Sequence, residues 1–138
     1  MSREPELKIT RRKLPHWTLE GAIYFVTFRV LTGVLTDEKM AITYEHIKKG
    51  NSRFYLLIAL VVMPDHVHML LKPLEKYDLS RIMKGTKGVS SRLINKHRNA
   101  TGNVWQDESF DRIVRDLKEL HEKINYMYMN PVKAGLVE

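Results

Sequence analysis

The sequence contains no cysteine. This absence excludes disulfide bonds and thiolate metal sites, and it leaves His, Asp, Glu, Asn and Gln as metal ligands. The sequence also lacks a long apolar run, because the longest one, Leu56 to Met63, is far too short to cross a bilayer. The N-terminal residues Met1–Lys13 are charged, and no hydrophobic signal region follows them. We therefore expect a soluble, cytoplasmic protein without a membrane partner.

Acidic residues are too few to balance the basic ones, with 16 Asp and Glu against 23 Lys and Arg. The formal net charge is +7 and the isoelectric point is about 9.7. Such an excess favours a polyanionic partner, most simply nucleic acid. The 138 residues, of which 43% are hydrophobic, suffice for one packed core. We therefore expect a single domain over residues 1–138, with residues 1–17 as a basic N-terminal arm.

Hydrophobic periodicity in the first half of the chain predicts a strand, a helix and a hairpin. Aromatic and β-branched residues predict a strand at Tyr24–Val30. Apolar residues at helical spacing predict a helix that begins at Asp37 as N-cap and ends near Gly50. The apolar run Phe54–Met63 and the segment His66–Leu71 are predicted to pair as a β-hairpin.

The second half predicts two helices around a strand region. A long helix is expected from Leu79 to about Arg98, and one or two short strands within Val104–Val114. The last helix is expected over Asp116–Met129, ended by Pro131 and Gly135. The order strand, helix, hairpin, helix, strand, helix predicts an α+β, ferredoxin-like fold with the helices on one face of an antiparallel sheet.

His66 and His68 stand two apart on a predicted strand, so their imidazoles point to the same face. Val67, Met69 and Leu71 point to the opposite face. If that apolar side packs under the helices, the histidine pair lies on the open face, ready to chelate a metal ion. Without further evidence, two surface histidines are the more common explanation of this pattern.

The last helix carries a tyrosine away from its expected core side. At about 100° per residue, one stripe contains Leu117, Leu120, Ile124, Met127 and Tyr128. Tyr126 lies on the opposite side, and Asn130 follows it by one turn. Solvent exposure alone would explain a tyrosine beside an amide, whereas Tyr128 is expected in the core.

Four motifs resemble a known family. The segment Val62–Leu71 (VMPDHVHMLL) resembles the His-hydrophobic-His motif of the single-tyrosine HUH transposases, and 126–137 (YMYMNPVKAGLV) resembles their tyrosine segment. Trp105–Arg112 (WQDESFDR), and LPHW at 14–17 with YFVTFR at 24–29, resemble the REP-associated tyrosine transposase (IS200-like) branch. The four motifs in order are far more specific than a lone His-x-His pair.

The resemblance implies a role for each matching residue. His66 and His68 are then metal ligands, Tyr126 is the nucleophile and Asn130 fills the third ligand position. The implied activity is a metal-dependent transesterification of single-stranded or hairpin DNA that leaves a 5′-phosphotyrosine and a free 3′-hydroxyl. The metal is expected to be Mg²⁺ or Mn²⁺, and both a monomer and a homodimer stay open.

Basic side chains are candidates for contacts with DNA phosphates. They come from the arm and from the long helix: Arg11, Arg12, Lys13, Arg81, Lys84, Lys87 and Arg92. Trp17 and Trp105 are candidate stacking platforms, although a solvated face and a core position explain such residues equally well. Two other functions stay open: a non-catalytic module that binds single-stranded or hairpin DNA, and a metal-dependent hydrolase that uses water.

Overall fold

The computed structural model describes residues 21–133, so the arm predicted at residues 1–17 lies outside the described residues. Seven elements follow one another: β1 (Ile23–Val30), α1 (Asp37–Lys49), β2 (Tyr55–Val62), β3 (His66–Pro73), α2 (Leu79–Arg98), β4 (Trp105–Val114) and α3 (Leu117–Lys133). The strands form one antiparallel sheet in the order β2-β3-β1-β4. The predicted α+β fold with a ferredoxin-like order of elements is confirmed.

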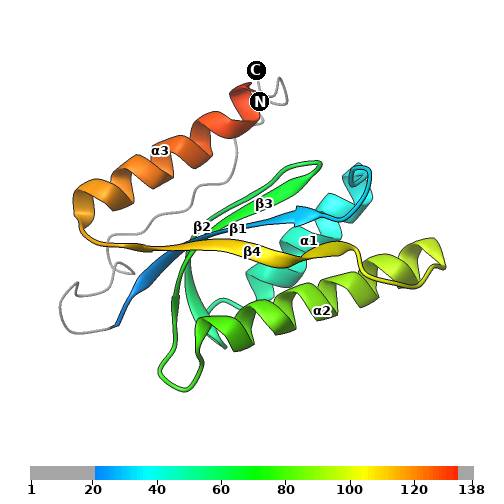
Figure 1. Ribbon diagram of the computed structural model, residues 1–138, viewed down its shortest axis with the longest axis horizontal. Helices are drawn as coiled ribbons and strands as arrows, with labels where there is room; N and C mark the ends of the chain where they lie inside the picture. The colour runs from blue at the N-terminus through cyan, green and yellow to red at the C-terminus, as the bar shows by residue number, and fades with distance from the viewer. Residues whose placement is uncertain (1–20, 134–138) are drawn as a thin grey trace.

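The sheet lies between two layers of helices (Figure 1). One buried cluster combines Val67, Met69 and Leu71 of β3 with Ile47 of α1 and Ile82 of α2. Helices α1 and α2 therefore cover the face that receives the apolar side of β3, as the alternation in that strand predicted.

Helix α3 lies on the opposite face of the sheet. A second buried cluster joins Leu120 and Met127 of α3 to Phe25 of β1 and Leu70 of β3. The expectation that the helices share one face therefore holds for α1 and α2 and is wrong for α3. The histidine face is not open, because α3 crosses it.

Several element ends differ from the prediction for local reasons. The N-cap of α1 is Thr36, whose side chain accepts a hydrogen bond from the backbone N–H of Lys39, and Asp37 is already helical.

The second half of the chain differs in one strand and in the last helix. Residues 105–114 form one strand of 10 residues. Helix α3 continues through Pro131 to Lys133, beyond the end that the proline suggested. Helix α2 has the predicted bounds, with Asp78 as N-cap and a left-handed Asn99 as C-cap.

Among the described residues, no helix is both long enough and apolar enough to span a membrane.

Candidate active site

A row of side chains crosses the sheet beneath α3. The register places His68 of β3 opposite Thr27 of β1, and Thr27 opposite Phe110 of β4. Directly opposed residues in adjacent strands point to the same face. The three side chains therefore line one surface, and it is the surface that α3 crosses.

His68 is held in a defined orientation. Its Nδ1 lies 2.8 Å from the hydroxyl oxygen of Thr27, and its Nε2 is buried with no hydrogen-bond partner. Burial, and then the charges of His66, Arg29 and Lys123, lower the pKa of His68 to about 3. A neutral imidazole that donates Nδ1–H to Thr27 has its lone pair on the unpartnered Nε2. This is the state that a metal ligand needs.

His66 has an analogous arrangement at the edge of the hairpin. Its Nδ1 lies 2.7 Å from Oδ1 of Asp65, and this hydrogen bond is the main cause of the lowered pKa of Asp65. The backbone N–H groups of Val30 and Leu35 donate to the carbonyls of Asp65 and Pro64, which fixes the hairpin turn. The rings of His66 and His68 are 4.7 Å apart, centroid to centroid. A carboxylate that orients an imidazole through Nδ1 is a common feature of metal sites.

Helix α3 brings Tyr126 to the histidines. Met127 and Leu120 are fully buried against the sheet, which sets the rotation of the helix. The Tyr126 ring is 47% exposed and lies 5.4 Å from the ring of His68, centroid to centroid. Tyr128 is half-buried, so its expected core position is only partly met, and Leu117 is exposed, contrary to the predicted stripe.

A cavity of about 480 Å³ opens beside Tyr126 and contains residues that the sequence interpretation missed. Arg29 of β1, Phe110 of β4 and Lys123 of α3 line it together with Tyr126 and His68. The Nζ of Lys123 is 4.8 Å from the centre of the Phe25 ring. Two sequence signals indicate these positions: Arg29 alternates with Phe25 and Thr27 along β1, and Lys123 precedes Tyr126 by three helical positions.

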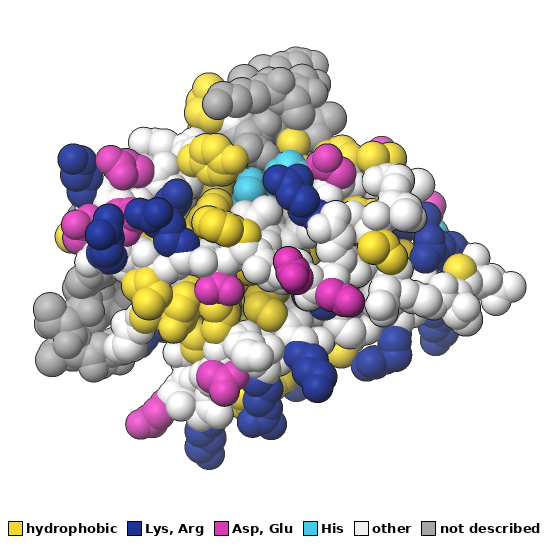
Figure 2. Space-filling view, viewed as in Figure 1, with side chains coloured by type: hydrophobic (Ala, Val, Ile, Leu, Met, Phe, Trp, Pro, Cys, Tyr) yellow, Lys and Arg dark blue, Asp and Glu magenta, His cyan; other side chains and the backbone are white. Residues whose placement is uncertain are grey.

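Figure 2 shows this face of the molecule, where histidine side chains reach the surface next to hydrophobic and basic side chains. Arg29 is exposed, and Phe110 has 58% of its surface exposed. The cavity thus combines a phenol, an imidazole, two cations and an exposed aromatic ring. Such a set suits a polyanion that also carries flat bases.

The histidine pair fits two ligand positions of a metal site, because the buried Nε2 of His68 has no other partner. Within residues 21–129, whose side chains are described, no three or more His, Cys, Asp or Glu residues form a group that could hold a metal ion. Asn130, the expected third ligand, has its backbone in α3, and its side chain is outside the described part.

The basic residues predicted on α2 fall into two places. Lys84, Lys87 and Arg92 line a second cavity between α2 and β4. Arg81 lies outside this lining, with its guanidinium 5.2 Å from the centre of the Tyr77 ring. Trp105 is not a stacking platform: it is 3% exposed and donates its indole N–H to Ser90 Oγ. The arm residues Arg11, Arg12 and Lys13, and Trp17, lie outside the described residues.

Comparisons with known proteins relate the chain to transposases. Residues 27–122 match the model of the protein family described as transposase IS200-like. The chain is 28% identical over 137 residues to a putative REP-associated tyrosine transposase of Haemophilus influenzae, covering 86% of this chain and 75% of that protein. It is 26% identical over 128 residues to the REP-associated tyrosine transposase of Escherichia coli K12, covering 87% and 72%.

Two solved structures are similar in fold. One is a REP-associated tyrosine transposase bound to a REP hairpin, with a TM-score of 0.72 and 23% identity, covering 90% of this chain and 74% of that one. The other is a putative transposase from Deinococcus radiodurans, with a TM-score of 0.53 and 20% identity, covering 83% and 96%.

Proposed function

Because the IS200-like transposase match spans well over half of the chain, the chain belongs to that family, and we propose that it cleaves and rejoins single-stranded DNA through Tyr126. The observation that carries this proposal is the position of the Tyr126 ring beside the neutral, buried His68. A nucleophile, a metal ligand and two cations then meet in one cavity.

His66 and His68 would hold a divalent ion, with Asn130 as the proposed third ligand. When bound, Mg²⁺ or Mn²⁺ would polarise the scissile phosphate and withdraw charge from its oxygens. Imidazole ligands suit Mn²⁺ better than Mg²⁺. Thr27 and Asp65 orient the two imidazoles through their Nδ1 atoms, which leaves the Nε2 atom of each ring for the metal ion.

Tyr126 supplies the nucleophile. Its Oη forms a bond to the phosphorus, while the bond from phosphorus to the 3′ oxygen breaks. The phenol proton goes to water, and the departing 3′ oxygen takes up a proton to become a hydroxyl. The products are a 5′-phosphotyrosine and a free 3′-hydroxyl. Because one phosphodiester has replaced another, the reverse reaction can rejoin the strand.

Arg29 and Lys123 would bind the phosphate from the two sides of the cavity. Arg29 comes from the sheet and Lys123 from α3, and both are close enough to His68 to lower its pKa. Cations that are already in place stabilise the charge of a phosphoryl transition state. The exposed ring of Phe110 would stack on an unpaired base next to that phosphate.

The proposed substrate is single-stranded DNA next to a hairpin. One of the two solved structures with a similar fold is a transposase bound to a REP hairpin. In this chain, the net charge of +7 and the basic side chains of α2 support binding to phosphates. The edge strand β4 gives the active-site cavity one wall, which leaves room for an unpaired strand.

A covalent-adduct assay tests the proposal. The full chain is incubated with labelled single-stranded or hairpin oligonucleotides and Mn²⁺ or Mg²⁺, and the products are separated under denaturing conditions. We expect a labelled protein band that a chelator abolishes. Binding without any adduct would indicate a non-catalytic module. Cleavage without an adduct, retained in Tyr126→Phe, would indicate a hydrolase that uses water.

A further inference from the structure

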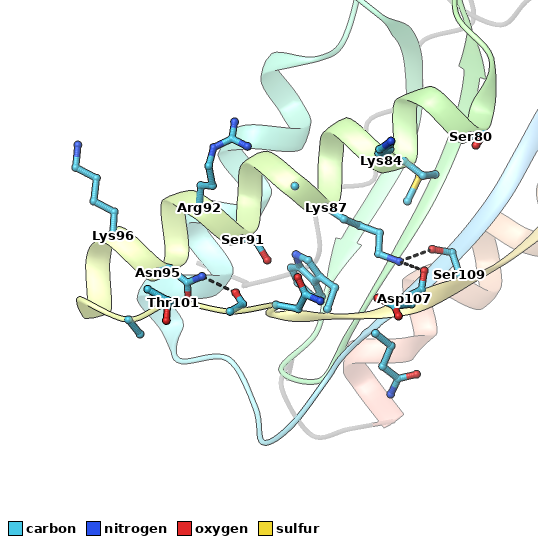
Figure 3. A pocket seen from close by; sticks show the side chains of 17 residues that line it. Ser80, Lys84, Lys87, Ser91, Arg92, Asn95, Lys96, Thr101, Asp107 and Ser109 are labelled. Atoms are coloured by element: carbon cyan, nitrogen blue, oxygen red, sulfur yellow. Dashed lines mark hydrogen bonds between the residues drawn. The ribbon is translucent and has the colours of Figure 1, made fainter.

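A second cavity lies away from Tyr126, between α2 and β4, and has a volume of about 880 Å³. Its size falls within the range of ligand pockets, which is roughly 300–1,000 Å³. Four basic residues and one acidic residue are among the described residues that line it. In Figure 3, Lys87 extends from α2 across to β4, whereas the side chains of Arg92 and Lys96 project from α2 away from β4.

The cavity is held open by side-chain hydrogen bonds between its walls. At one end, Lys87 Nζ donates to the carbonyl of Asp107 at 2.9 Å and to Ser109 Oγ at 3.1 Å. At the other end, Asn95 donates to the carbonyl of Gly102 at 2.7 Å. These bonds tie α2 to β4 and to the preceding loop, so the space between them is preformed (Figure 3). Burial lowers the pKa of Lys87, which packs partly between the two walls.

Gly88 supplies an independent observation. A glycine within a helix costs about 1 kcal/mol relative to alanine, so its presence usually has a packing reason. A Cβ at Gly88 would meet no protein atom within 4 Å, and Gly88 lines the cavity. Packing within the described chain therefore does not require this glycine. The absence of a side chain does allow a ligand to approach the backbone of α2 closely.

The two cavities share a wall. Gln106 and Ser109 line both the α2–β4 cavity and the cavity beside Tyr126. β4 is one of the two edge strands of the sheet, so a flexible chain can pass over it from one cavity to the other.

We propose that the α2–β4 cavity binds unpaired nucleotides of the same DNA strand whose phosphodiester lies at Tyr126. The basic side chains of α2 receive the phosphates, and the polar side chains Gln106 and Ser109 of β4 receive the bases. This inference rests on the proposed function, because it takes the strand at Tyr126 as its starting point. It adds a second subsite that would hold the strand non-covalently during cleavage and rejoining.

Two substitutions of Gly88, one charged and one neutral, test the proposed subsite. Gly88→Glu places a carboxylate in the cavity, and Gly88→Gln places a neutral side chain of the same size there. Gly85→Glu adds the same charge one turn earlier, at an exposed position outside the lining. Fluorescence anisotropy in metal-free buffer measures binding of a labelled single-stranded oligonucleotide and of its duplex, and circular dichroism confirms that each variant is folded.

We expect Gly88→Glu to weaken single-strand binding by roughly tenfold, as the loss of one or two phosphate contacts would do. Gly88→Gln and Gly85→Glu should lose much less, and duplex binding should change equally in both Glu variants. Equal losses for Gly88→Glu and Gly85→Glu, or an equal loss for duplex and single strand, would overturn the subsite.

Adduct formation separates this inference from the proposed function. In Gly88→Glu, the adduct should need more DNA for half-maximal yield but should reach the wild-type rate at saturating DNA. If the variants show the expected anisotropy pattern but the wild-type chain forms no adduct, the proposed chemistry is wrong and the subsite is supported. If the wild-type chain forms the adduct but Gly88→Glu binds single-stranded DNA as tightly as wild type, the subsite is wrong and the proposed chemistry is supported.

Discussion

The ring of Tyr126 lies 5.4 Å from the ring of His68, centroid to centroid, with 66° between their planes. The two residues come from opposite layers, since His68 belongs to the sheet and Tyr126 to α3. Their proximity depends on how α3 is anchored by Leu120 and Met127. Any change that moves α3 along the sheet therefore moves the proposed nucleophile relative to the proposed metal ligand.

Tyr126→Phe should abolish the covalent adduct and leave DNA binding and stability nearly unchanged. The substitution removes one hydroxyl from a ring that is 47% exposed. Tyr128→Phe is the matched control, because it removes a hydroxyl two residues away and should keep the adduct. Peptide mass spectrometry of the adduct identifies the modified residue, and a phosphorylated Tyr128 would contradict the assignment.

Thr27→Val should weaken metal binding by about 10–100-fold, the usual effect of losing a group that orients a ligating histidine. Valine has nearly the same shape, but it cannot accept the hydrogen bond from Nδ1 of His68. Thr27→Ser retains the hydroxyl and should bind metal almost normally. Isothermal titration with Mn²⁺ measures both affinities. An unchanged affinity in Thr27→Val would show that this hydrogen bond does not orient a ligand.

The sheet face of each side chain in β3 could be predicted from the sequence, because a strand has a period of two. Val67, Met69 and Leu71 lie in one core, while His66 and His68 point to the other side, as expected. The bounds of α2 were also predictable, from the helical spacing of its apolar residues and from the polar residues at its two ends. Local periodicity carries this information without knowledge of the rest of the fold.

The position of α3 could not be predicted in the same way, because an apolar stripe does not say which face of the sheet it covers. One signal was present in β2: its apolar run is continuous rather than alternating, which is typical of a strand buried on both faces. Arg29, Phe110 and Lys123 were missed because three separate elements bring them together. The structural comparison supports the fold, and the family match supports the family.

Glu119 should make stability depend on pH in the acidic range. The backbone N–H of Arg115 and the guanidinium of Arg112 lower the pKa of Glu119 to about 2 from an ordinary value of 4.5. Folding therefore favours the ionised form of the Glu119 carboxyl group over the protonated form. The resulting stabilisation is fully present above about pH 4.5 and is lost as the pH falls towards about 2. These bonds also set the turn from β4 into α3, on which Tyr126 depends.

Urea unfolding at about pH 7 and about pH 3 measures this effect. Glu119→Gln should lower stability at the higher pH and reduce the difference between the two conditions. Glu122→Gln removes an exposed carboxylate from the same helix and should retain the wild-type difference. An equal pH dependence in wild type and Glu119→Gln would show that Glu119 is not the responsible group.

Gly50→Ala should destabilise the protein by about 1–3 kcal/mol, the usual cost of forcing extra atoms into a packed site. Gly50 ends α1 with a φ of −75°, which any residue can adopt, so the requirement for glycine is steric. A Cβ there would collide with the Tyr55 ring. That ring cannot move aside cheaply, because it is buried and its hydroxyl donates to the carbonyl of Ile47 at 2.5 Å.

Gly85→Ala is the matched control. A Cβ there meets nothing within 4 Å, so the better helix propensity of alanine should stabilise the protein by up to about 1 kcal/mol. Urea unfolding of both variants gives the two free energies, and a Gly50→Ala chain as stable as wild type would mean that the junction of α1 and β2 can repack around the Tyr55 ring.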